Sequence, residues 1–311
     1  MRIVFMGTPD FARDSLKSLV EAGHEIELVV TNPDKPKGRG MKMIPSEVKE
    51  YAISQGLEIA QPLKVRNNEE FVQKIKEINP DVICVVAYGK IIPKEILEIP
   101  KFGCINVHGS LLPKYRGAAP IQWAVINGDK ETGVTTMFMD EGMDTGDMIL
   151  KEVIEIGENE TTGELWDRLS AIGGKLLVRT LELIENGEVE REKQGEEFTL
   201  APMLNKDIAV IDWENKSAKQ IKDLVRGLNP FMGAYSFLNG KKIKFWKVEI
   251  VDEKSCKEPG TVISASPKEG LFVATIDKVV SVLEVQGENS KKMSISDYLR
   301  GNSIEVDEKF K

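Results

Sequence analysis

The sequence is poor in cysteine and histidine, with three of the first and two of the second among 311 residues. So few sulfur and imidazole ligands exclude a disulfide framework and speak against a structural zinc site. Cys84 and Cys104 lie inside apolar runs, whereas Cys256 does not. We therefore expect buried, reduced thiols, as in a cytoplasmic protein.

Long apolar stretches are also absent. No run reaches about 18 apolar residues, so we expect no membrane-spanning helix. The N-terminus runs directly into a strand pattern, which predicts no signal peptide. No internal repeat or low-complexity tract is present. The turn Met6–Asp10 lacks the G-x-G-x-x-G pattern and has Pro9 where phosphate-binding amides would be needed, so a nicotinamide cofactor is not expected.

Length and composition are those of a folded protein with two domains. The chain is 41% hydrophobic and 30% charged, enough to bury a sizeable core. Its net charge of −8 is distributed unevenly. Residues 206–311 carry 18 Lys and Arg against 16 Asp and Glu, and residues 1–205 carry 24 against 34. A mildly basic C-terminal part on an acidic body is a weak indication of an anionic partner.

The first part of the chain alternates strand and helix patterns, which predicts a doubly wound, mostly parallel α/β sheet. The strands are expected at residues 3–6, 25–31, 57–60, 81–87, 103–108 and 132–139, and the helices at residues 9–20, 46–55, 67–78, 119–127 and 161–184. Residues 188–206 are polar and irregular and are expected to be a linker. We therefore expect a first domain over 1–187 and a second domain over 207–311.

The second domain carries a helix pattern at residues 217–229, followed by short strand patterns. These strands are expected at residues 234–238, 242–251, 260–265, 271–275 and 281–285. About five short strands separated by turns predict a small β-barrel.

The most informative stretch is the strand that ends in Asn106 and His108. Residues i and i+2 of a strand point to the same face, and the carboxyl end of a parallel strand is where open α/β sheets bind ligands. An amide and an imidazole there can together stabilise a developing oxyanion. Taken alone, the pair fits a turn cap and a buried structural histidine at least as well.

A glycine-rich acidic turn follows the strand at 132–139. Asp140, Asp144 and Asp147 lie within it, but their spacing does not fit a calcium loop. A carboxylate beside His108 would orient the imidazole and favour its charged form. From the residues alone, any of the three aspartates can be the one that reaches His108, and the others are expected to form the turn.

Together these segments resemble the folate-dependent formyltransferase family, and within it the branch that formylates methionyl-tRNA. The resemblance spans nearly the whole chain and rests on Met6–Phe11, Asn106 with His108, Ser110–Gln122, Asp140–Gly146, Ile211–Trp213 and Ile221–Tyr235. It implies a one-carbon transferase that takes a formyl group from 10-formyltetrahydrofolate, with no metal, and a C-terminal barrel that is OB-like. It further implies that Asn106, His108 and Asp144 are catalytic and that Ser110, Leu111, Leu112 and Pro113 contact folate.

The same resemblance implies that an inserted loop, residues 34–49, enters the acceptor end of initiator methionyl-tRNA. Residues 32–45 hold three prolines and two glycines and show no periodicity, so a long loop is expected. Lys35, Lys37, Arg39 and Lys42 can neutralise phosphates there; a solvated basic loop is the plain alternative. The barrel's cluster at 241–247 interleaves lysines with Phe245 and Trp246, and either phosphate contact or a lysine-covered edge strand explains it.

Two other functions remain open from the sequence. A relative that formylates an amino sugar or a nucleotide amine would share the catalytic residues and the folate loop. A non-catalytic RNA-binding or folate-sensing protein would not need Asn106, His108 and Asp144 together. The family resemblance also implies a monomer.

Overall fold

The structure is a computed structural model that describes residues 1–37 and 42–311. The chain folds into two compact units. The first comprises Met1–Pro120, Thr132–Ile154 and Trp166–Pro202, and the second Ile121–Glu131, Glu155–Leu165 and Met203–Lys311. No helix among these residues is both long and apolar enough to cross a membrane.

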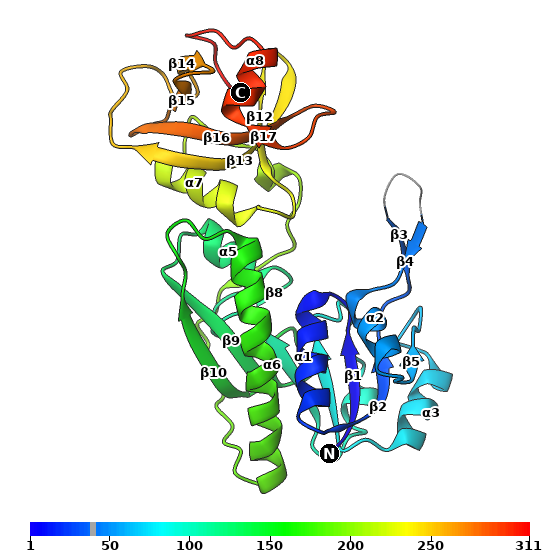
Figure 1. The fold of residues 1–311 in the computed structure, drawn as a ribbon. Helices are drawn as coiled ribbons and strands as arrows, with labels where there is room; N and C mark the ends of the chain where they lie inside the picture. Colours follow the sequence, from blue (N-terminus) through cyan, green and yellow to red (C-terminus); the bar gives the residue numbers. More distant parts are fainter. Residues whose placement is uncertain (38–41) are drawn as a thin grey trace. The chain divides into compact units, whose positions relative to one another are not determined.

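The first unit is built on a seven-stranded sheet with the order β10-β9-β7-β6-β1-β2-β5 (Figure 1). The strands β7, β6, β1, β2 and β5 are parallel neighbours, and β9 joins β7 in antiparallel pairing. The predicted mostly parallel α/β sheet is thus confirmed. The strands are β1 Arg2–Gly7, β2 Glu25–Val30, β5 Ile59–Ala60, β6 Val82–Val86, β7 Cys104–His108, β9 Glu131–Phe138 and β10 Met148–Glu155.

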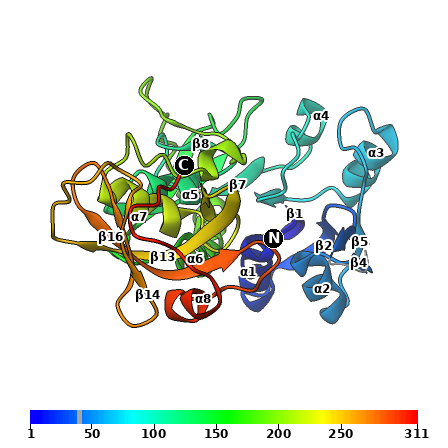
Figure 2. The same cartoon turned by 90° about the horizontal axis from the view of Figure 1, so that it is seen from above.

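The chain returns between the parallel strands through helices α1 Asp10–Glu21, α2 Glu47–Ser54, α3 Glu69–Ile78 and α4 Lys94–Leu97. Helix α6 Thr162–Asn186 follows β10. Helix α5 Pro120–Ile126 lies between β7 and β9 in the sequence and belongs mostly to the second unit. Helices α1 and α6 pack together: the rings of Phe11 and Trp166 lie 5.3 Å apart edge to face, and the Trp166 indole donates to Asp10 at 2.9 Å. Helices α2 and α3 lie at the β5 end of the sheet (Figure 2).

Several features of this unit were not expected from the sequence, including strand β10 and helix α4. The loop after β2 forms a short antiparallel ribbon from β3 Lys35–Lys37 and β4 Lys42–Ile44. A second two-stranded pairing joins β8 Arg116–Gly117 to β11 Leu200–Ala201. The latter strand lies in the segment expected to be a linker, so residues 188–202 pack on the first unit and not only connect it to the rest.

The second unit has an antiparallel sheet with the order β12-β13-β16-β15-β14, and β17 pairs with β16. Its elements are η1 Asp207–Ala209, α7 Ala218–Gly227, β12 Ala234–Leu238, β13 Lys241–Val251, β14 Val262–Ser266, β15 Gly270–Ala274, β16 Val279–Gly287, β17 Met293–Ser294 and α8 Ile295–Gly301. The C-terminal segment pairs with both outer strands, through Lys311 and Phe237 of β12 and through Asp307 and Val262 of β14. This closes the open sheet, as expected for a small barrel.

The core of the second unit is an aromatic cluster. Trp213, Phe245 and Phe310 are buried, and their ring centroids lie 5.4–5.8 Å apart. The Trp213 indole donates to Ser236 at 3.0 Å, so its polar end is satisfied inside the core.

Candidate active site

Strand β7 presents Asn106 and His108 on one face of the sheet, as predicted from their spacing. In the antiparallel pairing with β9, Asn106 lies opposite Met137 and His108 opposite Thr135. The alternating residues face the other way: Thr136, opposite Val107, shares a hydrogen bond of 2.8 Å with Thr180 of α6. Helix α6 therefore covers the opposite face, and the polar pair is left on the face that the loop after β7 crosses.

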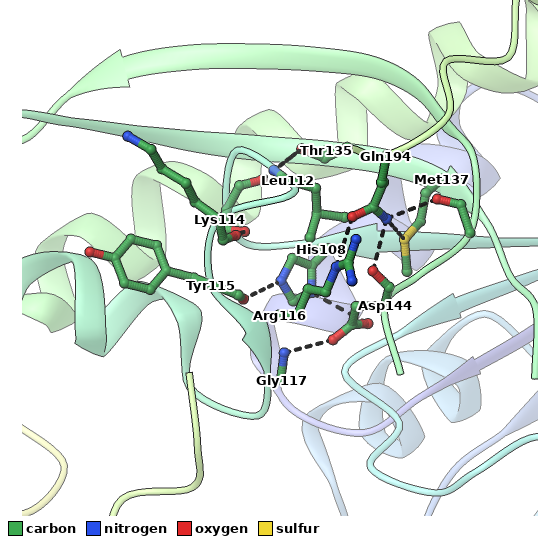
Figure 3. Close-up of polar contacts among 12 residues, drawn as sticks. His108, Leu112, Lys114, Tyr115, Arg116, Gly117, Thr135, Met137, Asp144 and Gln194 are labelled. Carbon is green, nitrogen blue, oxygen red and sulfur yellow. Dashed lines mark hydrogen bonds and ion pairs between the residues drawn. The ribbon is translucent and has the colours of Figure 1, made fainter. Parts of the chain in front are cut away.

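The ring of His108 is held between two oxygen atoms (Figure 3). Its Nε2 lies 2.9 Å from the carbonyl oxygen of Tyr115, and its Nδ1 lies 3.7 Å from Oδ1 of Asp144. A carbonyl oxygen only accepts, so Nε2 carries a proton and donates it. The ring is only 6% exposed. Nδ1 is therefore the nitrogen that remains for chemistry.

The structure decides which aspartate reaches His108, a point the residues alone left open. Asp144 does so, from a left-handed backbone conformation with φ +55°. Its other oxygen, Oδ2, accepts from the backbone amide of Gly117 at 2.8 Å. Asp140 instead accepts from the Gly142 amide and the Thr145 hydroxyl, which makes it a turn-forming residue.

Asn106 is half-buried and makes no side-chain hydrogen bond to the residues that the structure describes. Its amide donors are therefore uncommitted, on the same strand face as His108. An uncommitted amide beside an oriented imidazole and a carboxylate is an arrangement that can receive a carbonyl group and stabilise negative charge on its oxygen.

The loop after β7 holds the four residues assigned to folate contact, of which two are buried and two are partly exposed. Ser110 is buried, and its hydroxyl donates to the Lys114 carbonyl at 2.6 Å. Leu112 is also buried and clusters with Met137 and Met148. Leu111 and Pro113 are partly exposed. Within this stretch, only Leu111, Pro113 and backbone atoms are accessible to a ligand.

The residues assigned to tRNA contact belong to the β3–β4 ribbon, except Arg39, which lies outside the described residues. Lys35 is exposed, and the backbone of Lys37 pairs with that of Lys42. Asp34, just before the ribbon, pairs with Lys49 at 2.7 Å and accepts from Gln61 at 2.8 Å. The Lys49 ammonium and then the Gln61 amide hold the pKa of Asp34 below its ordinary value. These contacts tether the base of the ribbon to α2 and to the segment that follows β5.

Sequence reasoning missed the residues that hold His108 and Asp144 in place. Tyr115 and Gly117 act through backbone atoms, which no side-chain pattern reveals. Gln194 donates to the carbonyl oxygens of Asp144 and Gly146, 48 or more positions away, from a stretch without periodicity. Among the described residues, no group of three or more histidine, cysteine or acidic side chains is placed to hold a metal ion.

Known proteins resemble this chain over nearly its whole length. Residues 1–181 match the model of the family described as formyl transferase, and residues 203–303 match the formyl transferase C-terminal domain. The methionyl-tRNA formyltransferase of Clostridioides difficile is 55% identical over 307 residues, covering 98% of each chain. That of Caldanaerobacter subterraneus is 51% identical over 305 residues, again with 98% of each chain covered.

Solved structures share the fold at lower identity. HypX from Aquifex aeolicus, in complex with tetrahydrofolic acid, aligns with a TM-score of 0.66 at 19% identity, covering 99% of this chain and 50% of that one. An N-formyltransferase from Helicobacter canadensis, in complex with folinic acid and dTDP-3-aminofucose, aligns with a TM-score of 0.66 at 20% identity, covering 90% and 98%. At such identities the likeness concerns the fold alone.

Proposed function

The chain belongs to the methionyl-tRNA formyltransferase family, and we propose that Asn106, His108 and Asp144 carry its reaction. The enzyme transfers a formyl group from 10-formyltetrahydrofolate to the α-amino group of methionine on initiator tRNA, in support of translation initiation. The observation that carries the proposal is the facing pair Nδ1 of His108 and Oδ1 of Asp144, on the strand face that also holds the uncommitted Asn106 amide.

The transfer needs an electrophile whose oxygen is stabilised as it gains charge. The neutral amine attacks the formyl carbon, a C–N bond forms, and the electron pair of the C=O bond moves onto oxygen. Asn106 donates to this oxygen from its side-chain amide. His108 donates from Nδ1 in its imidazolium form, because Nε2 is engaged by the Tyr115 carbonyl. The ion pair with Asp144 then balances the charge of that ring.

A proton completes the exchange. The attacking nitrogen loses one as the intermediate forms, and N10 of the folate gains one as the C–N10 bond breaks. The products are formylmethionyl-tRNA and tetrahydrofolate. His108, Asp144 and an ordered water are the groups that can relay the proton. Oδ1 of Asp144 is the carboxylate oxygen that faces His108, since Oδ2 accepts from Gly117.

The donor folate is proposed to lie against the loop of residues 110–113. Ser110 and Leu112 are buried and stabilise the shape of that loop, so their proposed role is to position the residues that contact folate. Leu111, Pro113 and the loop's backbone are the proposed contact atoms.

The acceptor tRNA is proposed to bind basic residues of both units. In the first unit these are Lys35, Lys37, Arg39 and Lys42. The proposed tRNA-contacting domain, residues 207–311, adds lysines set over aromatic rings: Lys242 lies 3.4 Å from the Tyr235 centroid and Lys244 lies 5.5 Å from that of Trp246. Such pairs suit phosphates and stacked bases. We also propose a monomer that acts in the cytoplasm, with the catalytic domain at 1–187 and the connection at 188–206.

One assay tests the proposal directly. The purified chain is given 10-formyltetrahydrofolate and charged initiator methionyl-tRNA, and formylmethionine is measured by mass after hydrolysis of the ester. A dTDP-linked amino sugar is offered in a parallel reaction as a control acceptor. We expect rapid formylation of the tRNA and none of the sugar. Formylation of the sugar alone, or of neither acceptor, would overturn the proposal.

A further inference from the structure

Gln194 lies in the segment between α6 and β11, and its side chain reaches into the turn that carries Asp144 (Figure 3). Its amide nitrogen donates to the carbonyl oxygens of Asp144 at 2.8 Å and of Gly146 at 2.9 Å. One side chain thus bridges two carbonyls of the turn, on either side of Thr145. It touches the backbone of Asp144 and not the carboxylate.

The direction of this amide follows from its third contact. Arg116 donates from Nε to Oε1 of Gln194 at 2.9 Å. A guanidinium only donates and a carbonyl only accepts, so the oxygen must face Arg116 and the nitrogen must face the turn. Arg116 is itself buried, with its guanidinium 4.6 Å from the ring centroid of Phe198. The amide is therefore fixed at both ends.

Together these contacts hold Asp144 from two sides. The Gly117 amide, next to Arg116 in β8, holds the carboxylate through Oδ2, and Gln194 holds the main chain. A non-glycine residue with positive φ persists where its surroundings over-determine it. Asp144, at φ +55°, meets that condition.

We propose that Gln194 is a positioning residue of the formyl transfer, which fixes Oδ1 of Asp144 opposite Nδ1 of His108. This rests on the proposed roles of His108 and Asp144. A displaced turn would move the carboxylate away from an imidazole already 3.7 Å distant, and the charge of the ring would lose its partner. Substrate binding would be little affected, because the hydrogen bonds of the Gln194 side chain go to the turn, Arg116 and Met137 and to none of the proposed folate-contacting residues.

The decisive variant is Gln194→Glu. It keeps the shape of the side chain and the acceptor for Arg116, but it cannot donate to the carbonyls of Asp144 and Gly146. Gln194→Met, which has similar length and no charge, is measured beside it. Glu196→Gln is the matched control, because it makes the reverse exchange on an exposed side chain of the same segment.

A merely structural role is separated by a double-mutant cycle with Asp144→Asn. Steady-state kinetics give kcat and KM for the single variants, and single-turnover rates with excess enzyme are added for the cycle, so that slow variants remain measurable. If Gln194 works through the Asp144 carboxylate, its substitution matters only while that carboxylate is present. If it only supports the fold, both backgrounds lose rate equally.

We expect Gln194→Glu and Gln194→Met to lower kcat roughly tenfold or more, with KM for both substrates within about twofold of wild type. In the Asp144→Asn background the further loss should be under about twofold. Unchanged kcat in both variants, or equal losses in both backgrounds, would overturn the inference while wild-type formylation still supports the proposed function. A wild-type enzyme that does not formylate methionyl-tRNA would overturn both.

Discussion

The carboxylate of Asp144 is aimed by a backbone group: its Oδ2 accepts from the amide of Gly117 at 2.8 Å, which leaves Oδ1 facing His108. Gly117 can hold this place only without a side chain. Its φ is +124°, and an added Cβ would lie 2.7 Å from the carbonyl oxygen of Ala201. The orientation of an acidic side chain thus depends on the pairing of two short strands, β8 and β11.

Gly117→Ala is therefore expected to reduce both stability and catalysis. The strained backbone should cost about 1–3 kcal/mol in the free energy of unfolding. As β8 moves away from β11, the Gly117 amide leaves Asp144, and kcat should fall. Urea unfolding and steady-state kinetics measure the two effects. Gly195→Ala is the control, because an added Cβ there has no neighbour within 4 Å. Wild-type values for Gly117→Ala would contradict this account of the strand pairing.

Asn106→Ala should separate catalysis from stability. The Asn106 amide has no side-chain hydrogen bond within the described part of the chain, so its removal leaves no buried partner unsatisfied. Loss of one oxyanion donor should lower kcat by about 10²–10³. Single-turnover formylation and thermal unfolding are the measurements. A marked fall in Tm with little change in rate would assign Asn106 to the fold.

Asp144→Asn tests the assignment among the three aspartates of the turn. Asparagine retains an oxygen that accepts from the Gly117 amide, but it removes the charge that faces His108. We expect kcat to fall by about 10²–10⁴, with folate affinity retained in a fluorescence titration. Asp140→Asn is the matched control, since that side chain is exposed and only supports the turn. Comparable rate losses in the two variants would remove the special role of Asp144.

The basic residues between positions 34 and 49 should act on the tRNA and not on folate. Lys35→Ala and Arg39→Ala are each expected to raise KM for methionyl-tRNA and to reduce the slope of log affinity against log salt by roughly 1. Folate binding should stay unchanged. Lys17→Ala, on the exposed side of α1, controls for the loss of one positive charge. An identical salt slope in all variants would leave the ribbon as a solvated basic loop.

The parts of this molecule that sequence patterns predicted carry a local apolar signal. Continuous apolar runs placed β1 and β6 correctly, and a shorter apolar stretch placed β7. The two-residue period of a strand put Asn106 and His108 on one face. Other features have no such signal. The β3–β4 ribbon has three-residue strands interrupted by Pro36, and β10 mixes charged and apolar residues.

The choice of Asp144 from the residues alone was not possible, because the distances from three aspartates to His108 depend on how the turn folds. Gln194 was missed for a related reason. It lies in a polar stretch read as a linker, and its partners are backbone carbonyls and a distant arginine. For Ser110 and Leu112 the family resemblance identified the loop correctly. It did not show that these two side chains point inward.

The three cysteines should differ sharply in reactivity, because the thiolate is the nucleophile. Burial raises the pKa of Cys104 to about 12. The pKa of Cys84 is also raised, mainly by burial and to a lesser extent by the neighbouring Cys104. At pH 8 the thiolate fraction of Cys104 is then on the order of 10⁻⁴. Cys256 is exposed. Iodoacetamide should label Cys256 in the native protein and all three cysteines in urea, as read by peptide mass spectrometry. Cys84 and Cys104 lie on the central strands β6 and β7, so their labelling requires the sheet to open. If either is labelled in the native protein as fast as Cys256, the centre of the sheet is accessible and this account is wrong.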